Sequence, residues 1–234
     1  MPDFSKRSYE KELLDRTDIP FSDIKRNMQE LEFINSNLGG HKITVNGIKK
    51  LFNKVNKKQI SVCEIGCGGG DNLKAIARWC RKNNIHVQLT GIDINKDCIE
   101  YARENYVGPD EINFIISDYR LVKLDTNKPD IIFSSLFTHH LDDQQFEEML
   151  QWCNQNAGYG FFINDLHRHF LAYYSIKFLT QLFSKSYLVK NDAPLSVRRG
   201  FRKSEIRKLL RAGRIEHFDI EWKWAFRWLI TVQK

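Results

Sequence analysis

The chain has 234 residues, of which 42% are hydrophobic, 28% charged and 12% aromatic. This length fits one domain with a full hydrophobic core, and the composition excludes an intrinsically disordered chain. No uncharged apolar stretch is about 18 residues long and the N-terminal residues are charged throughout, so we expect neither a transmembrane helix nor a secretory signal. Residues 195–234 contain 11 basic and 4 acidic residues, so they account for the whole net charge of +7, and residues 1–194 are neutral. The five cysteines lack paired metal-ligand spacing, so we expect reduced thiols, no metal site and a cytoplasmic location.

Residues 1–57 are predicted to form an N-terminal helical cap. Ser22 is the expected N-cap of a first helix, whose apolar residues recur at helical spacing until Gly39-Gly40 ends it. A second helix is expected over residues 44–55. The pattern changes after these helices, and we interpret residues 58–234 as one cofactor-binding domain.

Short apolar runs alternate with amphipathic segments in the first half of that domain. Strands are expected at 60–65, 86–92, 112–117, 130–133 and 159–163, and helices at about 71–83, 96–106 and 142–153. Strands that alternate with helices imply right-handed crossovers, and therefore a doubly wound, mostly parallel sheet.

Residues 165–190 interrupt this alternation. They are rich in aromatic residues and keep helical spacing over about 169–184, so we interpret them as a helical insertion after the fifth strand that covers an apolar substrate pocket. A peripheral contact of this insertion with a membrane surface is a weaker alternative, because the helix has few cations. A helix over 203–212 and strands over 215–220 and 226–233 complete an α/β fold, with a Rossmann-like, seven-stranded sheet that ends in an antiparallel hairpin.

The strongest motif is the glycine-rich turn over residues 66–70, directly after the first expected strand. Glycines let the backbone turn sharply and approach a ligand closely. Asp71 occupies the place of the third glycine of a dinucleotide fingerprint, and no P-loop lysine follows the glycines. The acidic Glu64 and Asp71 therefore favour a cationic or zwitterionic ligand over a phosphate, and they disfavour a nicotinamide dehydrogenase.

Further acidic residues end the next two strands. Asp93, followed by Ile94, closes the second strand, where a carboxylate can accept hydrogen bonds from both hydroxyls of a ribose. Asp118 and Tyr119 follow the third strand, where the carboxylate could accept from an exocyclic amine and the ring could stack on a base.

The turn over 64–70, Asp93, Asp118 and the segment 134–141 together resemble the class I S-adenosylmethionine-dependent methyltransferases. Among these, the chain looks most similar to the small-molecule enzymes grouped with ubiquinone and menaquinone biosynthesis. The resemblance implies S-adenosylmethionine as cofactor, with its ammonium near Glu64, its ribose at Asp93 and its adenine at Asp118. The cofactor-binding residues that it implies are Glu64, Gly66, Gly68, Asp93, Ile94, Asp118, Tyr119 and Ser134.

Methyl transfer from a sulfonium is an in-line displacement, so the protein mainly aligns the nucleophile and excludes water. A phenol or quinol acceptor must also lose a proton, and a histidine suits that step. His139 and His140, directly after the fourth strand, are the candidate catalytic residues. The residues expected to line the substrate pocket are His41, His167, His169 and Tyr173.

The leading hypothesis is therefore a methyltransferase for a small, apolar acceptor of the phenol or quinol type. One alternative is an RNA or other nucleic-acid methyltransferase that uses the basic C-terminal region, and another is a cofactor-binding protein without catalysis. The neutral residues 1–194 and the absence of an N/D-P-P-Y/F motif after the fourth strand disfavour a nucleic-acid partner. Arg198 and Arg199 could instead meet an anionic substrate group. The acceptor, the methylated atom and the oligomeric state stay open.

Overall fold

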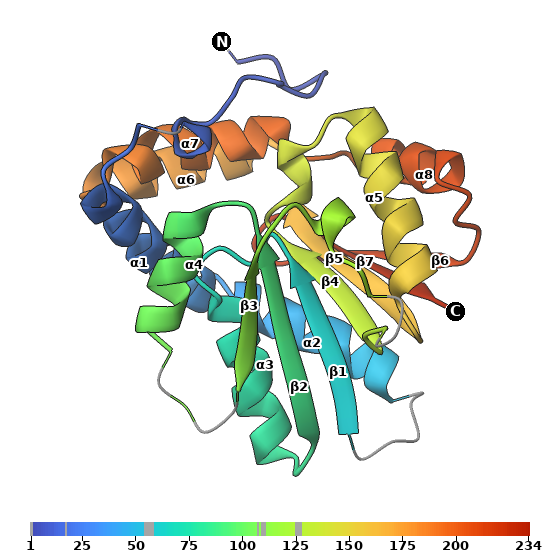
Figure 1. Ribbon diagram of the computed structural model, residues 1–234. Helices are drawn as coiled ribbons and strands as arrows, with labels where there is room; N and C mark the ends of the chain where they lie inside the picture. Colours follow the sequence, from blue (N-terminus) through green and yellow to red (C-terminus); the bar gives the residue numbers. More distant parts are fainter. Residues whose placement is uncertain (1, 17, 54–58, 107, 109–110, 125–127) are drawn as a thin grey trace.

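The computed structural model describes residues 2–16, 18–53, 59–106, 108, 111–124 and 128–234. One sheet of seven strands runs through the molecule in the order β3-β2-β1-β4-β5-β7-β6 (Figure 1). The first five strands are parallel, and β7 is antiparallel to both β5 and β6. The predicted fold class, terminal hairpin included, is confirmed. The strands are β1 (Gln59–Ile65), β2 (His86–Asp93), β3 (Ile112–Ile116), β4 (Ile131–Ser135), β5 (Gly160–Leu166), β6 (Phe218–Lys223) and β7 (Arg227–Gln233).

Helices cover both faces of this sheet, and the alternation of side chains along β1 shows why. Val62 points into one hydrophobic cluster, which also contains Leu73. Cys63 points into the other, which also contains Phe146 and Ile206. A strand that is apolar on both sides is thereby buried on both sides. The helices of the first face are α2 (Gly40–Phe52), α3 (Asp71–Lys82) and α4 (Lys96–Glu104), and those of the second are α5 (Asp143–Asn156) and α8 (Lys203–Ala212).

The strand register brings the motif residues to one edge of the sheet. Ile65 of β1 lies opposite Ile92 of β2 and opposite Ser134 of β4. Ser134 in turn lies opposite Ile163 of β5. The four central strands therefore end side by side, and the segments that follow them meet there, as expected for a doubly wound sheet.

The N-terminal region differs from the predicted helical cap. Residues 2–16 and 18–20 form an extended strap apart from one short 3-10 turn, η1 (Leu13–Asp15). The helix α1 (Phe21–Asn37) has Pro20 rather than Ser22 at its N-cap, and α2 begins at Gly40 instead of residue 44. The end of the second helix at 55 and the boundary at 57 lie outside the described residues, so the division into two domains stays a prediction.

Two helices fill the segment after β5. α6 (Phe170–Phe183) confirms the helix expected over 169–184, whereas α7 (Tyr187–Arg199) was not predicted. The interior Pro194 of α7 removes one backbone donor, and this is a sequence signal against a helix. α1, α6 and α7 lie together over the carboxyl ends of the central strands (Figure 1). Within the described part of the chain, no helix is long and apolar enough to cross a bilayer.

Candidate active site

The glycine-rich turn closes the carboxyl end of β1. Gly66, Gly68 and Gly70 have φ values of +69°, +48° and +73°, which glycine adopts without strain. The amide of Gly66 donates to the carbonyl of Ile92 at 2.8 Å and so ties the turn to β2. A Cβ atom on Gly66 would lie 2.4 Å from the ring of Phe137. The turn is therefore a bare-backbone cradle that side chains would fill.

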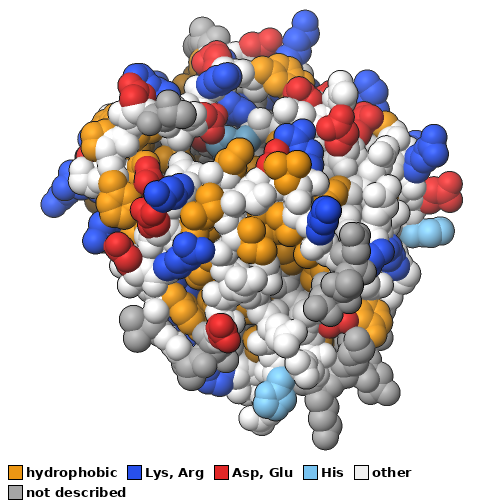
Figure 2. All heavy atoms as spheres, in the orientation of Figure 1, with side chains coloured by type: hydrophobic (Ala, Val, Ile, Leu, Met, Phe, Trp, Pro, Cys, Tyr) orange, Lys and Arg blue, Asp and Glu red, His pale blue; other side chains and the backbone are white. Residues whose placement is uncertain are grey.

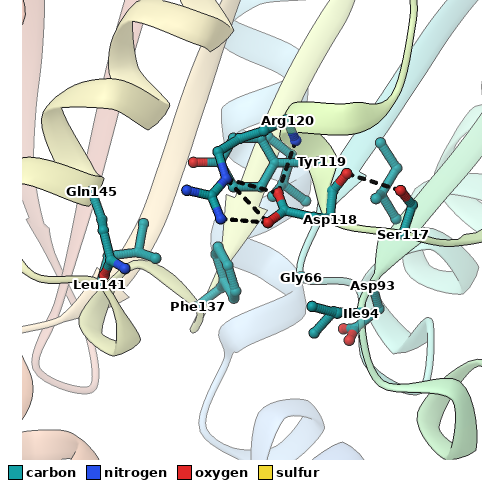
Figure 3. Close-up of a pocket in the computed structure, with 12 residues that line it drawn as sticks. Gly66, Asp93, Ile94, Ser117, Asp118, Tyr119, Arg120, Phe137, Leu141 and Gln145 are labelled. Atoms are coloured by element: carbon teal, nitrogen blue, oxygen red, sulfur yellow. Dashed lines mark hydrogen bonds and ion pairs between the residues drawn. The ribbon is translucent and has the colours of Figure 1, made fainter.

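Two hollows open on this cradle, and both are lined by Gly66, Asp93, Ile94 and Phe137. The smaller one, of about 160 Å³, extends towards residues 117–120 (Figure 3). The larger one, of about 940 Å³, extends under α1, α6 and α7. A ligand held at Asp93 can thus reach both hollows. Figure 2 shows hydrophobic side chains gathered over the ends of the central strands on the face that it presents.

Asp93 lies where the two hollows meet. One carboxylate oxygen accepts from the amide of Gly68 and the other from the amide of Asn95, each at 2.8 Å. Burial raises the pKa of Asp93, while the two amide hydrogen bonds oppose that rise. The backbone thus fixes this carboxylate at the position where the sequence predicts a ribose contact, and that role stays a prediction.

Asp118, at the rim of the smaller hollow, has a partner that the sequence analysis did not identify. The Nε atom of Arg120 donates to both carboxylate oxygens, at 3.0 and 3.1 Å (Figure 3). This hydrogen bonding lowers the pKa of Asp118. The ring of Tyr119 is buried with its edge against Trp152, at a centroid distance of 5.3 Å. It contributes a wall of the hollow, and stacking on a base stays a prediction.

Glu64 is fully buried behind the glycine turn. One oxygen accepts from Asn72 at 3.2 Å, and the other has no partner among the described residues. Burial and, next, the carboxylate of Asp71 raise the pKa of Glu64 well above its ordinary value. A cationic group nearby would stabilise the ionised form. The unpartnered oxygen and the glycine cradle therefore fit a cofactor that carries an ammonium.

We expect cofactor binding to release a proton from Glu64. The raised pKa favours the protonated carboxyl in the free protein, and an ammonium beside it would lower that pKa again, so binding should release up to one proton per cofactor. Calorimetry of S-adenosylmethionine binding in buffers of different ionisation enthalpy, at neutral and mildly acidic pH, measures this release. Glu64→Gln should bind without it. Equal proton release by wild type and variant would contradict the assignment.

Ser134 is hydrogen-bonded within the sheet, and its predicted cofactor contact stays a prediction. Its buried hydroxyl donates to the carbonyl of Ile65 at 2.9 Å, and it lines neither hollow. Successive residues of a strand point to opposite sides, so the next residue, Ser135, faces the larger hollow instead.

The two candidate catalytic histidines both line the larger hollow, in the short turn η3 (Thr138–His140). His139 is 3% exposed, and its Nδ1 lies 2.7 Å from an oxygen of Asp165 at the end of β5. Burial alone would lower the pKa of His139, but Asp165 and Glu12 raise it to about 9. Burial raises the pKa of Asp165, yet His139 and Thr138 bring it well below its ordinary value. His139 is thus a buried imidazolium at neutral pH, held between two carboxylates.

His140 is more accessible, with 23% of its side chain exposed. Its Nδ1 lies 3.3 Å from an oxygen of Asp15, and its Nε2 lies 3.7 Å from an oxygen of Glu12. Both carboxylates belong to the N-terminal strap, far from His140 in the sequence. Glu12 is buried beside both imidazoles, its other oxygen lying 3.6 Å from Nε2 of His139.

Two arginines hold the backbone of this turn. Arg199 of α7 donates to the carbonyls of His139 and His140 at 3.0 and 2.9 Å, and Arg7 of the strap donates to the carbonyl of Leu141 at 2.8 Å. Arg199 is buried, so it positions the histidines and does not face an anionic substrate group. The strap and α7 thus complete the site that the sheet begins.

We expect the His139–Asp165 pair to give the protein a stability that falls at alkaline pH. The pKa of His139 is raised from 6.5 to about 9, so its contribution is complete below about pH 6.5 and is lost as the pH rises through about 9. The loss is of order 3 kcal/mol in the free energy of unfolding. Urea unfolding of wild type and of His139→Gln across this pH range measures it. The variant should lose the dependence, whereas His217→Gln, at an exposed histidine, should keep it.

The residues predicted to line the substrate pocket lie outside the larger hollow. His41 bonds the carboxylate of Asp71 at 2.7 Å, and His167 packs on Trp228 at a centroid distance of 4.7 Å. Burial lowers the pKa of His167 to about 4. The other two predicted residues also have structural contacts: His169 accepts from the amide of Leu171 as the N-cap of α6, and Tyr173 packs against Phe4.

One group of three described side chains, Glu12, His139 and His140, brings potential metal ligands within 4.8 Å of one another. The hydrogen bonds and ion pairs above already give each of these groups a charged partner. The cationic Arg199 also lies against this turn, and its charge disfavours a second cation. The absence of a metal stays a prediction.

Comparison with known proteins identifies the domain. Residues 62–157 match the family model described as a methyltransferase domain. Among curated proteins, no sequence matches the chain.

Several solved structures share the fold. The plantazolicin methyltransferase BpumL in complex with SAH has a TM-score of 0.60 and 18% identity, over 91% of this chain and 95% of that one. Human N-acetylserotonin methyltransferase in complex with SAM has a TM-score of 0.61 and 20% identity, over 92% of this chain and 56% of that one. Magnesium protoporphyrin IX methyltransferase from Synechocystis PCC 6803, with bound SAM, has a TM-score of 0.56 and 13% identity, over 86% of this chain and 82% of that one. At these identities the likeness shows the fold. Residues 62–157 therefore form a methyltransferase domain, within a fold that these methyltransferases share.

Proposed function

We propose that the chain transfers the methyl group of S-adenosylmethionine to a small, apolar aromatic acceptor of the phenol or quinol type. The observation that carries this proposal is the larger hollow, which places the histidines and carboxylates of η3 and the strap beside the glycine turn. Its other walls, from α1, α6 and α7, are mainly apolar.

The size of the hollow supports a small-molecule acceptor. Its volume of about 940 Å³, part of which a cofactor at the glycine turn would occupy, lies within the range of about 300–1,000 Å³ that is usual for small-molecule pockets. Apolar side chains such as Met28, Leu31, Ile176 and Val189 form much of the wall. Such a lining favours a ring with an apolar substituent over a highly charged acceptor.

The charged groups of the site fit the chemistry of such an acceptor. Bound S-adenosylmethionine supplies an activated methyl group on a sulfonium, and Glu64 and Asp93 are the residues proposed to hold its ammonium and ribose. His140 is placed to take the proton of the acceptor hydroxyl, whose oxygen would accept the methyl group that the bound cofactor supplies. Asp15 and Glu12 stabilise the resulting imidazolium, and His139 keeps Glu12 in place.

The finer resemblance to ubiquinone- and menaquinone-type enzymes rests on the same features. The structurally similar proteins are named for plantazolicin, magnesium protoporphyrin IX and N-acetylserotonin. Since these names differ widely, the shared fold does not select an acceptor. The apolar hollow and the His140 group are what favour a phenol or quinol.

The basic C-terminal region supports the nucleic-acid alternative less than its charge suggests. Arg199 and Arg227 are buried, Arg198 pairs with Glu10 at 2.9 Å, and Lys223 pairs with Glu221 at 2.8 Å. On the face in Figure 2, basic and acidic side chains are interspersed. Several of the cations that a nucleic-acid surface would need are therefore buried or paired within the protein.

A methyl-transfer assay with labelled S-adenosylmethionine tests the proposal. The acceptors are phenols and quinols, each with and without an alkyl tail, and a mixed RNA sample. We expect transfer to the tailed phenols or quinols and none to RNA. Transfer to RNA alone, with an affinity that falls steeply with salt, would replace the small-molecule acceptor by a nucleic acid.

A further inference from the structure

α6 presents apolar side chains on two opposite sides. Its inner side lines the larger hollow through Ala172, Ile176 and Leu179. Its outer side repeats large apolar residues at the spacing of one helix face, through positions 170, 174, 178 and 182. These outer residues are between 46% and 65% exposed, although the rings of Phe170 and Tyr174 also contact those of His169 and Tyr173. They are Phe170, Leu171, Tyr174, Phe178 and Leu182, and Phe183 is exposed at the end of the helix.

The charged side chains around this outer face are all basic within residues 166–191. Residues 166–191 contain no Asp or Glu, and the exposed Lys177 and Lys185 lie along the helix and at its end. The nearby acid Glu30 of α1 faces the helix terminus, where it accepts from the amides of Lys185 and Ser186 at 2.9 and 3.0 Å. The outer face is therefore apolar, and the few charged side chains beside it are cationic.

We propose that α6 binds the surface of an anionic lipid bilayer. The helix lies in the plane of the interface, with its outer face among the acyl chains and its lysines at the lipid phosphates. The inference rests on the proposed function in one respect: because the inner side of α6 walls the hollow, a lipid-tailed acceptor can pass from the bilayer into the site beneath the same helix.

The charges argue against a second copy of the chain as the occupant of this face. A two-fold interface sets the same patch of both subunits against itself. On α6 that arrangement brings Lys177 and Lys185 of the two copies together around an apolar contact, where their repulsion is weakly screened. An anionic bilayer instead complements them.

Co-sedimentation of the full chain with vesicles tests the proposal. The vesicles contain phosphatidylcholine alone or mixed with phosphatidylglycerol. We expect binding to the mixed vesicles, and a partition coefficient at least about tenfold lower for the double variant Phe178→Ser/Leu182→Ser. Phe33→Ser is the matched control, because Phe33 on α1 is 69% exposed against 65% for Phe178. It should bind as wild type does.

Lysine variants test the electrostatic part. Lys177→Gln and Lys185→Gln should each weaken binding to the mixed vesicles by about fivefold, with little effect on neutral vesicles. Cofactor binding and methyl transfer to an untailed phenol should be unchanged in Phe178→Ser/Leu182→Ser, since neither side chain lines the hollow.

Each outcome separates this inference from the proposed function. If the wild-type chain does not co-sediment with the mixed vesicles, the proposed membrane contact is wrong. A dimer that the double variant converts to a monomer overturns it too, in favour of a second copy. Vesicle binding that depends on Phe178 and Leu182, in a chain that methylates no phenol or quinol, supports the contact and rejects only the proposed acceptor.

Discussion

Replacing His140 with alanine is expected to lower kcat by about 10²–10⁴-fold while leaving the Kd of S-adenosylmethionine nearly unchanged. The reason is that His140 borders the acceptor hollow and contacts carboxylates rather than the residues proposed to hold the cofactor. Single-turnover transfer to a phenol acceptor, with cofactor binding by calorimetry, measures both quantities.

His139→Gln provides the comparison for that variant. It removes the imidazolium beside Glu12 but leaves His140 in place, so we expect a smaller loss of kcat together with a weaker fold. Added imidazole should partly restore turnover in His140→Ala and not in His139→Gln. If His140→Ala turns over as fast as wild type, His140 is not the base.

The N-terminal strap and α7 are the parts of the fold that could not be predicted from the sequence. The strands were predictable because each is a short apolar run buried on both sides, and parallel strands must end at one edge. The strap carries no such periodicity, and the extended path of its described residues is fixed by contacts with distant segments, such as the bond from Arg7 to the carbonyl of Leu141. α7 escaped for a different reason, since tertiary packing overrides the unfavourable Pro194.

In the site, too, residues at the strand ends could be predicted from local sequence patterns, whereas partners from distant segments could not. Asp93, Gly66 and the two η3 histidines lie at the strand ends where the sequence places them. The carboxylate partners of the histidines, Glu12 and Asp15, come from the strap, more than 120 positions away in the sequence. No local sequence pattern links them to the histidines.

Histidines near the expected site were harder to place than acids. His167 and His169 follow β5 as predicted, but one packs on Trp228 and the other caps α6. The backbone direction at each strand end decides which side chain faces a hollow. Residue type alone does not predict that orientation. The same reason explains why Ser135 faces the larger hollow while Ser134 bonds within the sheet.

Replacing Asp93 with alanine is expected to raise the Kd of S-adenosylmethionine by about 100-fold or more. Two charge-assisted hydrogen bonds to ribose hydroxyls are together worth about 3 kcal/mol, and this energy corresponds to about two orders of magnitude in affinity. The variant also deprives the amides of Gly68 and Asn95 of their acceptor, so the glycine turn itself should loosen.

Asp93→Asn separates these two effects. Its amide oxygen can still accept from one backbone amide, but its NH2 group cannot accept from the second donor and carries no charge. We therefore expect a Kd between those of wild type and Asp93→Ala, with kcat at saturating cofactor close to wild type in both variants. Calorimetry gives the affinities, and thermal unfolding shows whether the fold survives. An unchanged Kd in a well-folded Asp93→Ala would move the ribose away from the end of β2, and with it the whole placement of the cofactor across the two hollows.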